Sequence, residues 1–396
     1  MLKKSLQNHK VLFISINGDP PTSGYGTRVF NMMLSLKKAS IDIEILRFYP
    51  IFKTKQKWKE TCNLHSIPCI ELPIPPFSRF AFPRFIGLWI ANIITHIFAI
   101  IKNASAVQAE TQDSAAAVLM HNWSNKPIVI DLHGASSEEA LFFHPNIAHK
   151  RISWLDRAEL KSLKKAAYCW VVSQQMIEHL HNKFPTAQIN SCKVIPVSVD
   201  PIFFKEQDKI SARKQLNVSD SEILFVYCGG NQNYQCIPEM ANLFANIITK
   251  ISARFLIIST NHASFIEHFA NFGDKVIYRS ATHNEVPGLL CAADVGLLLR
   301  SNHIINRVSC PTKAGEYLAC GLPIITTPWA GHAPKLAKSF GVGISVDPSL
   351  PDLGEIFNFL KNLPSKEHCK QVARQQLDGQ LGNKTMLECY EKLLSH

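Results

Sequence analysis

The residues best suited to chemistry are three cations and a carboxylate between positions 300 and 316. Arg300 closes a short apolar run, Arg307 lies in a polar loop, and Lys313 falls in the first turn of a predicted helix. Glu316 follows one turn later. Guanidinium and ammonium groups bind phosphate oxygens, and a carboxylate can accept hydrogen bonds from the two hydroxyls of a ribose. The set is therefore suited to a nucleoside diphosphate. The alternative is a solvated ion pair between Lys313 and Glu316, which would contribute only about 0.2–0.5 kcal/mol.

A strand, a loop and a helix are needed to bring these groups to one place. Residues 295–299 form a short apolar run, which is typical of a strand buried on both faces of a parallel sheet. A polar loop follows over 300–310, and a helix is predicted between Pro311 and Gly321. The next buried strand is predicted over 322–327. A helix that begins beyond the carboxyl end of a parallel strand points its free N–H groups at the ligand crevice, so an anion is expected there.

The run PTKAGEYLACGLPIITT, preceded by LLLRSNHIINRVS, resembles the donor-nucleotide segment of retaining glycosyltransferases of family 4, which have the GT-B fold. It is especially similar to members that make bacterial surface polysaccharides. The resemblance implies that Glu316 binds the ribose of the donor and that Arg300 and Lys313 hold its diphosphate. Many members carry a second glutamate eight positions earlier, where this chain has Val308. The contact to the donor sugar would then come from the backbone or from Asn306, and Arg307 is expected to add charge for the diphosphate.

The segment GYGTRV follows the first predicted strand, residues 10–17. It is weak evidence for a dinucleotide, because Val29 stands where the third glycine of that fingerprint would be. The resemblance implies instead that Gly24 and Gly26 form a loop over the donor phosphates or the acceptor, before a helix that starts at Thr27. A plain strand-to-helix turn is the alternative.

A second glycine pair, Gly229 and Gly230, follows the predicted strand 222–228 and is expected to face the donor. Many family members place an arginine and a lysine just after this turn. Here residues 231–235 read NQNYQ and carry no positive charge. We therefore expect the diphosphate to depend on the cations at positions 300, 307 and 313.

A histidine follows the predicted buried strand 127–132 directly and precedes Gly134. This is the edge of an α/β sheet at which ligands bind. An isolated histidine is often structural, but the resemblance implies that His133 contacts the donor sugar, with Asp131 orienting it or capping a turn. Because the chain lacks an Asp-x-Asp motif, we expect neither a metal ion nor a cofactor.

The fold class predicted is α/β, with two doubly wound Rossmann-like domains that face a central cleft. A chain of 396 residues is too long for one ordinary domain of about 100–200 residues, and the strand-helix series occurs twice. We expect residues 1–198 to form the acceptor-side domain, closed by a strand over 194–199, and residues 199–376 the donor-binding domain. A helical tract over 366–394, broken near Gly379 or Gly382, is expected to return residues 377–396 to the first domain.

Residues 85–101 form an uncharged apolar segment that contains Asn92 and His96. It is shorter than the about 20 residues of a bilayer span. Three interpretations are open: a domain helix with one face that dips into a membrane, which we favour, a wholly buried helix, or a true span. A basic, proline-rich insertion over 50–84 precedes it, and Arg79, Arg84 and Lys102 would meet anionic head groups.

The composition indicates which binding partners and which cellular compartment to expect. The net charge of +11 favours anionic partners. It is not gathered into a block with interleaved aromatic residues, which argues against nucleic acid. The eleven cysteines lack metal-like spacing and suit a reducing compartment, and the N-terminus reads as a first strand and not as a secretory signal. We therefore expect a cytoplasmic protein, with a peripheral place on the inner face of the cell membrane.

These observations predict a hexosyltransferase that moves a sugar from a nucleotide-diphosphate sugar to a glycan or lipid-linked acceptor. The resemblance implies retention of configuration without a metal ion, in surface polysaccharide biosynthesis. Closure of the two domains would bring His133 to the sugar and complete a site with Lys313 and Arg300. One alternative is a sugar-nucleotide epimerase of the same fold. Another is a membrane-associated assembly protein that has lost its chemistry, which Val308 and the uncharged 231–235 segment would favour.

Overall fold

The computed structural model describes residues 6–19, 21, 23–51, 58–75, 81–187, 191–377 and 379–395, apart from the side chains of 81–83 and 380–381. The chain forms two compact units: Met1–Pro196 with Gln380–His396, and Val197–Gly379. The domain boundaries expected from the sequence were 198/199 and 376/377. Much of the predicted basic insertion, including Arg79, lies outside the described residues.

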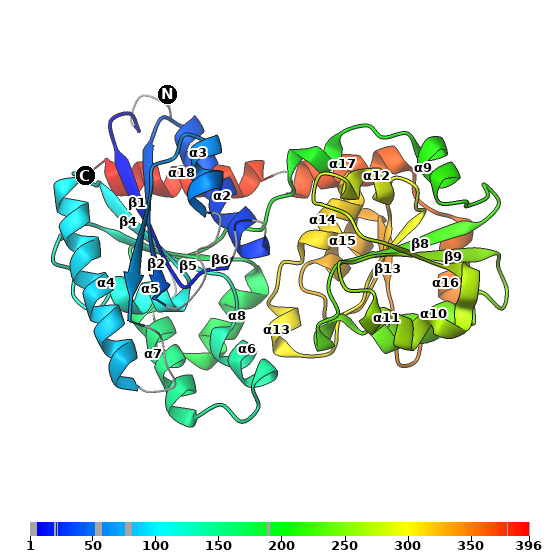
Figure 1. The fold of residues 1–396 in the computed structure, drawn as a ribbon, viewed down its shortest axis with the longest axis horizontal. Helices are drawn as coiled ribbons and strands as arrows, with labels where there is room; N and C mark the ends of the chain where they lie inside the picture. Colours follow the sequence, from blue (N-terminus) through cyan, green and yellow to red (C-terminus); the bar gives the residue numbers. More distant parts are fainter. Residues whose placement is uncertain are drawn as a thin grey trace. The chain divides into compact units, whose positions relative to one another are not determined.

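The first unit is built on a parallel sheet that has seven strands within the described residues, in the order β3-β2-β1-β4-β5-β6-β7. The strands are β1 (Lys10–Ile16), β2 (Asp42–Pro50), β3 (Cys69–Ile74), β4 (Ala106–Glu110), β5 (Ile128–Leu132), β6 (Tyr168–Val171) and β7 (Cys192–Val194). Every residue of β4 and β5 is buried, because helices cover both faces of the sheet (Figure 1). The strand order reverses between β1 and β4, and the crevice at the carboxyl ends of these strands is where such sheets bind ligands.

The helices of the first unit are α2 (Gly24–Lys38), α3 (Trp58–Leu64), α4 (Ala81–Ile101), α5 (Thr111–Val118), α6 (Ser136–Phe143), α7 (His149–Lys165), α8 (Gln174–Lys183) and α18 (Gln380–Leu394). The last of these is the C-terminal helix, which packs beside α2 (Figure 1). Its Met386 and Tyr390 are buried in the same apolar cluster as Val29 and Phe30. The predicted return of the C-terminal helix to the first domain is thereby confirmed.

The second unit repeats the design with six parallel strands among the described residues, in the order β10-β9-β8-β11-β12-β13. The strands are β8 (Ile223–Cys228), β9 (Ala253–Ile258), β10 (Val276–Arg279), β11 (Val295–Leu298), β12 (Ile324–Thr326) and β13 (Gly343–Ser345). The α-helices are α9 (Lys209–Gln215), α10 (Ile237–Ile247), α11 (Ala263–Phe269), α12 (Val286–Leu290), α13 (Ile304–Arg307), α14 (Thr312–Ala319), α15 (Ala333–Phe340), α16 (Leu353–Lys361) and α17 (Lys366–Leu377). Short 3-10 turns occupy η1 (Pro201–Phe204), η2 (Asn233–Gln235) and η3 (Ala270–Lys275). The predicted pair of doubly wound sheets is confirmed.

Three local predictions were wrong. The strand expected at 194–199 is β7, which ends at Val194, because Pro196 has no N–H to donate to a ladder. The insertion before α4 contains β3, whose Pro73 is tolerated because β3 is an edge strand. The polar loop over 300–310 contains the short helix α13, which His303 caps by accepting a hydrogen bond from the Ile305 N–H.

The helix α4 buries two polar side chains and exposes several large apolar ones. Asn92 is buried and donates to the carbonyls of Ala117 and His121, both at 2.9 Å. His96 is buried against Ser124 and the Val118 carbonyl. Phe85, Trp89 and Ile97 are 57%, 49% and 48% exposed. A helix whose exposed face lay in water would show the reverse pattern.

By length and composition alone, the segment Arg84–Ile101 of α4 also meets the requirements for a membrane span, and 39% of it is buried inside the structure. Its exposed apolar face shows that the helix is not wholly buried, which excludes that interpretation. The buried share and the packing of α4 on α5 are those of a domain helix.

The packing of α14 on the sheet gives a test of the second unit. A Cβ added to Gly296 in β11 would lie 2.4 Å from Cδ2 of the buried Tyr317. We expect Gly296→Ala to lower the free energy of unfolding by about 1–3 kcal/mol, as overpacking of a core does. The control is Gly24→Ala, where a Cβ has no heavy atom within 4 Å. Denaturant unfolding should show no comparable loss in the control, and equal stability of the two variants would contradict the packing described.

Candidate active site

In the second unit, the carboxyl ends of β8 and β11 and the start of α14 bring together Gly229 and Lys313. A Cβ added to Gly229 would lie 2.5 Å from Cε and 2.6 Å from Nζ of Lys313. Gly229 also has a φ of 144°, which side chains rarely adopt. Glycine is needed here for both reasons, and the lysine ammonium lies directly over the turn.

The guanidinium of Arg300 lies close to this turn as well. Its Cζ lies 4.8 Å from the ring centre of Tyr234, in the segment that follows Gly230. The side chain is buried, with an exposed fraction of 8% for the residue. Its Nε and Nη1 atoms have no hydrogen-bond partner among the described residues. A buried guanidinium with unsatisfied donors is costly, so an acceptor is expected in front of it.

Lys313 is the second cation of this group. Its Nζ donates to Oε1 of Gln235 at 3.3 Å and lies 5.0 Å from the ring centre of Tyr227. Burial and the charge of Arg300 lower the pKa of Lys313 to about 7. Neither cation forms an ion pair with a carboxylate in the part of the chain that the structure describes. Two like charges that repel each other, close to a glycine turn, form a site that an anion would stabilise.

Glu316 completes this arrangement one turn further along α14. Its carboxylate makes no hydrogen bond or ion pair within the described residues. Burial raises its pKa, and the charge of Lys313 partly opposes that shift. A partly buried carboxylate that is not bonded within the protein is suited to accept hydrogen bonds from the hydroxyls of a ligand.

Two of the predicted donor-binding residues form hydrogen bonds within their own loop. Arg307 is exposed, and its guanidinium donates to Oδ1 of Asn302 on its own loop at 2.5 Å. The amide of Asn306 is buried and donates to the carbonyl and the hydroxyl of Ser301, at 2.9 and 3.1 Å. Arg307 is thus not brought to Lys313, and Asn306 holds the loop that precedes α14.

Three residues of this site were not predicted, because uncharged side chains around the glycine turn give no direct signal for binding a diphosphate. Tyr227 lies under the Lys313 ammonium, Tyr234 stacks on Arg300, and Gln235 accepts from Lys313. Aromatic faces attract cations and an amide oxygen accepts from them. The alternation of Tyr and Gln in YCGGNQNYQ was the available signal. These groups position the cations that the sequence did predict.

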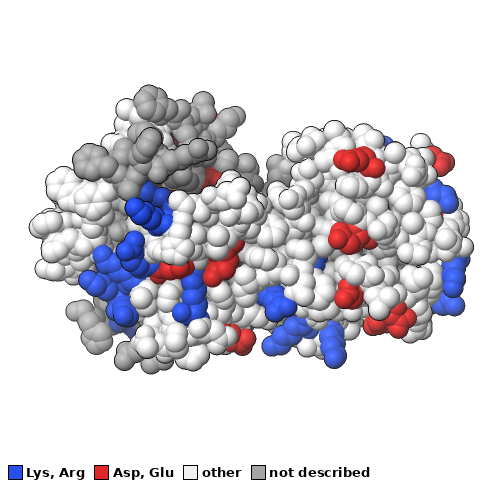
Figure 2. Space-filling view, turned by 90° about the horizontal axis from the view of Figure 1, so that it is seen from below, with Lys and Arg blue, Asp and Glu red and all other residues white. Residues whose placement is uncertain are grey.

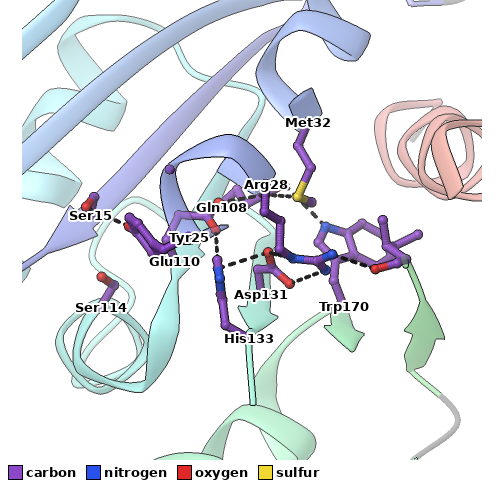
Figure 3. Close-up of polar contacts among 12 residues, drawn as sticks. Ser15, Tyr25, Arg28, Met32, Gln108, Glu110, Ser114, Asp131, His133 and Trp170 are labelled. Carbon is purple, nitrogen blue, oxygen red and sulfur yellow. Dashed lines mark hydrogen bonds and ion pairs between the residues drawn. The ribbon is translucent and has the colours of Figure 1, made fainter. Parts of the chain in front are cut away.

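In the first unit His133 is part of a buried cluster of charges at the end of β5 (Figure 3). Its Nε2 lies 3.0 Å from Oε2 of Glu110 and 3.1 Å from Oδ2 of Asp131. Arg28 binds Asp131 with two hydrogen bonds of 2.7 Å and donates to the Ile195 carbonyl at 2.6 Å. The cluster thus joins two cations to two carboxylates, which agrees with the expectation that Asp131 orients His133.

These contacts determine the protonation state of His133. Burial alone would lower the pKa of His133, but Asp131 and Glu110 outweigh it and raise the pKa to about 9. The imidazole is therefore charged at neutral pH. Its contacts to the carboxylates use Nε2, and Nδ1 has no hydrogen-bond partner among the described residues, so its N–H is available to a ligand.

The spacing of Glu110, Asp131 and His133 would also allow a metal ion, because their ligand atoms lie within 4.8 Å of one another. However, the imidazole already serves as the cation of this group, because its Nε2 lies within 3.1 Å of both carboxylates. Both oxygens of Asp131 already accept from Arg28. We therefore interpret the group as an ion-pair cluster, and independence from metal stays a prediction.

The glycine loop predicted at Gly24 and Gly26 is in fact the first turn of α2. Ser23 caps this helix by accepting a hydrogen bond from the Gly26 N–H at 3.1 Å. The early start places Tyr25 inside the unit, where its ring centre lies 4.8 Å from that of His133 and its hydroxyl contacts Ser15 (Figure 3). The two glycines therefore belong to a plain strand-to-helix turn, the alternative interpretation, and not to a loop over the ligand.

Comparison with known proteins finds a family model that matches part of the second unit and solved structures that match nearly the whole chain. The family model described as "Glycosyl transferases group 1" matches residues 222–353, which is less than half of the chain. This stretch includes Gly229, Arg300, Lys313 and Glu316. None of the curated proteins compared with the chain matches it.

Several solved structures have the same fold at low sequence identity. The chain is similar to sucrose-phosphate synthase from Thermosynechococcus elongatus, with 15% identity, a TM-score of 0.73 and coverage of 98% of this chain and 99% of that one. For Anabaena Alr3699/HepE in complex with UDP the identity is 14%, the TM-score 0.74 and the coverage 97% and 100%. For WaaG, a glycosyltransferase involved in lipopolysaccharide biosynthesis, the identity is 12% and the TM-score 0.66, and the match covers 95% of this chain and 98% of that one.

At these identities the structures show the fold, which is GT-B, while the family model covers the stretch that holds the cations. Over residues 222–353 the second unit is thus similar to group 1 glycosyltransferases, and the predicted enzyme class, a glycosyltransferase, is confirmed.

Proposed function

We propose that the second unit binds the diphosphate of a nucleotide sugar on Arg300 and Lys313 and the ribose on Glu316. The observation that carries this assignment is a pair of cations, the buried Arg300 and the partly buried Lys313, that form no ion pair within the described residues and lie at the switch point between β8 and β11. Anabaena Alr3699/HepE, which shares the fold, was solved with UDP and with UDP-glucose. A UDP sugar is therefore the first donor to test.

Breaking the bond between sugar and phosphate leaves negative charge on the departing diphosphate. Preorganised cations and the N–H groups at the start of α14 stabilise that charge without reorganisation during the reaction. Retention of configuration follows from the resemblance in this segment. The first unit would supply the charged imidazole of His133 to the sugar, in the role that the resemblance implies.

The acceptor we propose is a lipid-linked glycan in the synthesis of a surface polysaccharide, reached from the inner face of the cell membrane. The support is the outward apolar face of α4 together with the basic residues at its two ends, Arg84 and Lys102. Basic side chains also gather on one face of the first unit, next to a few acidic ones (Figure 2). Anionic head groups and an apolar interior suit such a surface.

The low pKa of Lys313 predicts proton uptake on donor binding. In the free protein this amine loses its proton as pH rises through about 7, well below its usual range. A bound diphosphate favours the charged form and raises the pKa, so at pH 8 binding of UDP should take up close to one proton. Affinity should fall as pH rises above 7. Calorimetric titration in two buffers of different ionisation enthalpy measures the uptake, and Lys313→Met should abolish it. Binding of UDP with no uptake in the wild type would contradict the assignment.

Because Arg300 is buried without an ion-pair partner, its replacement should weaken the binding of UDP without lowering the stability of the protein. Removing a buried, unpaired cation relieves its desolvation, so Arg300→Met should not lower the free energy of unfolding of the ligand-free protein. The affinity for UDP should drop at least about 10-fold, which equals about 1.4 kcal/mol. Arg307→Met is the matched control, because that exposed arginine is bonded to Asn302 on its own loop. If the control loses as much affinity as Arg300→Met, the diphosphate lies elsewhere.

The outward face of α4 predicts binding to anionic vesicles at low salt. Replacing Phe85 and Ile97 together by Ser removes apolar side chains that are about half exposed. We expect this double variant to sediment with vesicles far less than the wild type. Ile210→Ser changes an even more exposed apolar position, in the second unit, and should sediment as the wild type does. A wild-type protein that stays in the supernatant at low salt would remove the membrane from the proposal.

A further inference from the structure

A cavity of about 330 Å³ lies in the first unit, bounded by the starts of α5, α6 and α7. This volume is at the lower end of the about 300–1,000 Å³ of ligand pockets. Its walls include the polar side chains of Thr111, Ser136 and Glu139 and the apolar ring of Phe143. Hydroxyl and carboxyl groups beside an aromatic ring suit a sugar better than a lipid chain.

The cavity adjoins the His133 cluster through the backbone. Thr111 follows Glu110 directly and has a φ of 73°, a conformation that is a genuine outlier for a β-branched residue. Gly134 follows His133, and a Cβ added to it would lie 2.3 Å from Oε1 of Glu139. The cavity and the candidate catalytic histidine therefore share the carboxyl edge of β4 and β5.

Glu139 is one polar anchor in this cavity. Its carboxyl group has no hydrogen bond or ion pair to any of the residues that the structure describes. Burial raises its pKa to about 7, which the charge of His133 opposes and the charges of Glu159 and Glu138 support. A carboxyl group in this state can accept hydrogen bonds from sugar hydroxyls, or donate one.

Whereas Glu139 brings a carboxyl group to the cavity, Arg151 brings a positive charge to it. Arg151 and Arg84 both donate to Oδ1 of Asp113, at 3.4 and 2.8 Å, so that one carboxylate serves two guanidinium groups. Both arginines also lie over the ring of Trp154, at 4.6 and 4.1 Å from its centre. The buried Nη1 of Arg151 has no hydrogen-bond partner among the described residues. The local excess of positive charge suits a phosphate group.

Arg84 connects this charged edge to the outward face of α4. It is followed in that helix by Phe85 and, one turn later, by Trp89, and both are exposed. A polar cavity, a pair of arginines and an apolar stripe thus follow one another along the first unit. That sequence of surfaces corresponds to a sugar, a phosphate and a lipid joined in one molecule.

We propose that this cavity is the acceptor site and that it binds the glycosyl phosphate end of a lipid-linked glycan, with the sugar on Glu139, the phosphate on Arg151 and the lipid along α4. The inference rests on the proposed function and names the acceptor class for it.

The test is calorimetric titration of the full-length protein with two probes, glucose 1-phosphate and farnesyl phosphoglucose below its micelle concentration. Glu139→Ala and Arg151→Ala should each weaken both probes at least 10-fold. Arg157→Ala is the matched control, because Arg157 is exposed on the same helix α7, and its affinities should stay within 2-fold of the wild type. The prenyl probe should bind at least 10-fold more tightly than glucose 1-phosphate.

Wild-type affinities in both cavity variants, or no binding of either probe to the wild type, would overturn the site. Equal affinity for the two probes would overturn the lipid part and leave a free sugar phosphate as the ligand. Titration of the same variants with UDP separates these results from the proposed function. Unchanged UDP binding in Glu139→Ala and Arg151→Ala is expected, whereas a wild-type protein that binds no nucleotide would reject the donor assignment and not the cavity.

Discussion

The structure of the second unit depends on an unfavourable arrangement, two cations that lie close together and form no ion pair with a carboxylate within the described residues. Arg300 lies over Tyr234 and Lys313 lies over Tyr227, and the pKa of Lys313 falls to about 7 under burial and the charge of Arg300. The aromatic rings and the amide of Gln235 reduce the cost without neutralising the charge. Such a site is stable only because the sheet and α14 around it are well packed, and it gains most from a ligand that brings negative charge.

In the first unit, by contrast, the buried charges are paired with charges of the opposite sign. Arg28, His133, Asp131 and Glu110 form a buried cluster in which charges of both signs are paired (Figure 3). Pairing keeps the imidazole protonated and fixes its orientation, so the group can donate to a ligand through the ring nitrogen that the carboxylates leave open. The two units therefore differ in kind: one offers unneutralised charge for a diphosphate, and the other offers an oriented donor. That division is what a transferase with a charged leaving group requires. It also argues against the degenerate alternative, since the cations are in place although Val308 and the uncharged 231–235 segment depart from the family pattern.

Much of the fold could be predicted from the sequence because parallel strands buried on both faces leave continuous apolar runs, such as those of β5, β8 and β11. The end of α14 at Gly321 was also predictable. The break expected near Gly379 or Gly382 lies at Gly379, and both Gly321 and Gly379 have a positive φ. The edge strand β3 was missed because Pro73 within it and the prolines around it resemble a loop. The end of β7 at Val194 was readable from Pro196, which has no N–H to donate to the ladder.

The part of the site that depends on residue type and spacing could be predicted from the sequence. Arg300, Lys313, Glu316 and Gly229 lie at one sheet edge as the sequence suggested, whereas Arg307 and Asn306 are bonded within their own loop. Tyr234 and Gln235 could not be chosen from charge alone, because their role comes from contacts between segments far apart in the chain. The buried pairing of Arg28 with Asp131 is likewise a property of the packed sheet and not of either motif.

A crystal structure of the protein with bound UDP tests the central claim most directly. The account predicts phosphate oxygens within about 2.7–3.2 Å of the guanidinium of Arg300 and the Nζ of Lys313, and both ribose hydroxyls on the carboxylate of Glu316. A diphosphate bound elsewhere, with the buried nitrogens of Arg300 still lacking an acceptor, would contradict it.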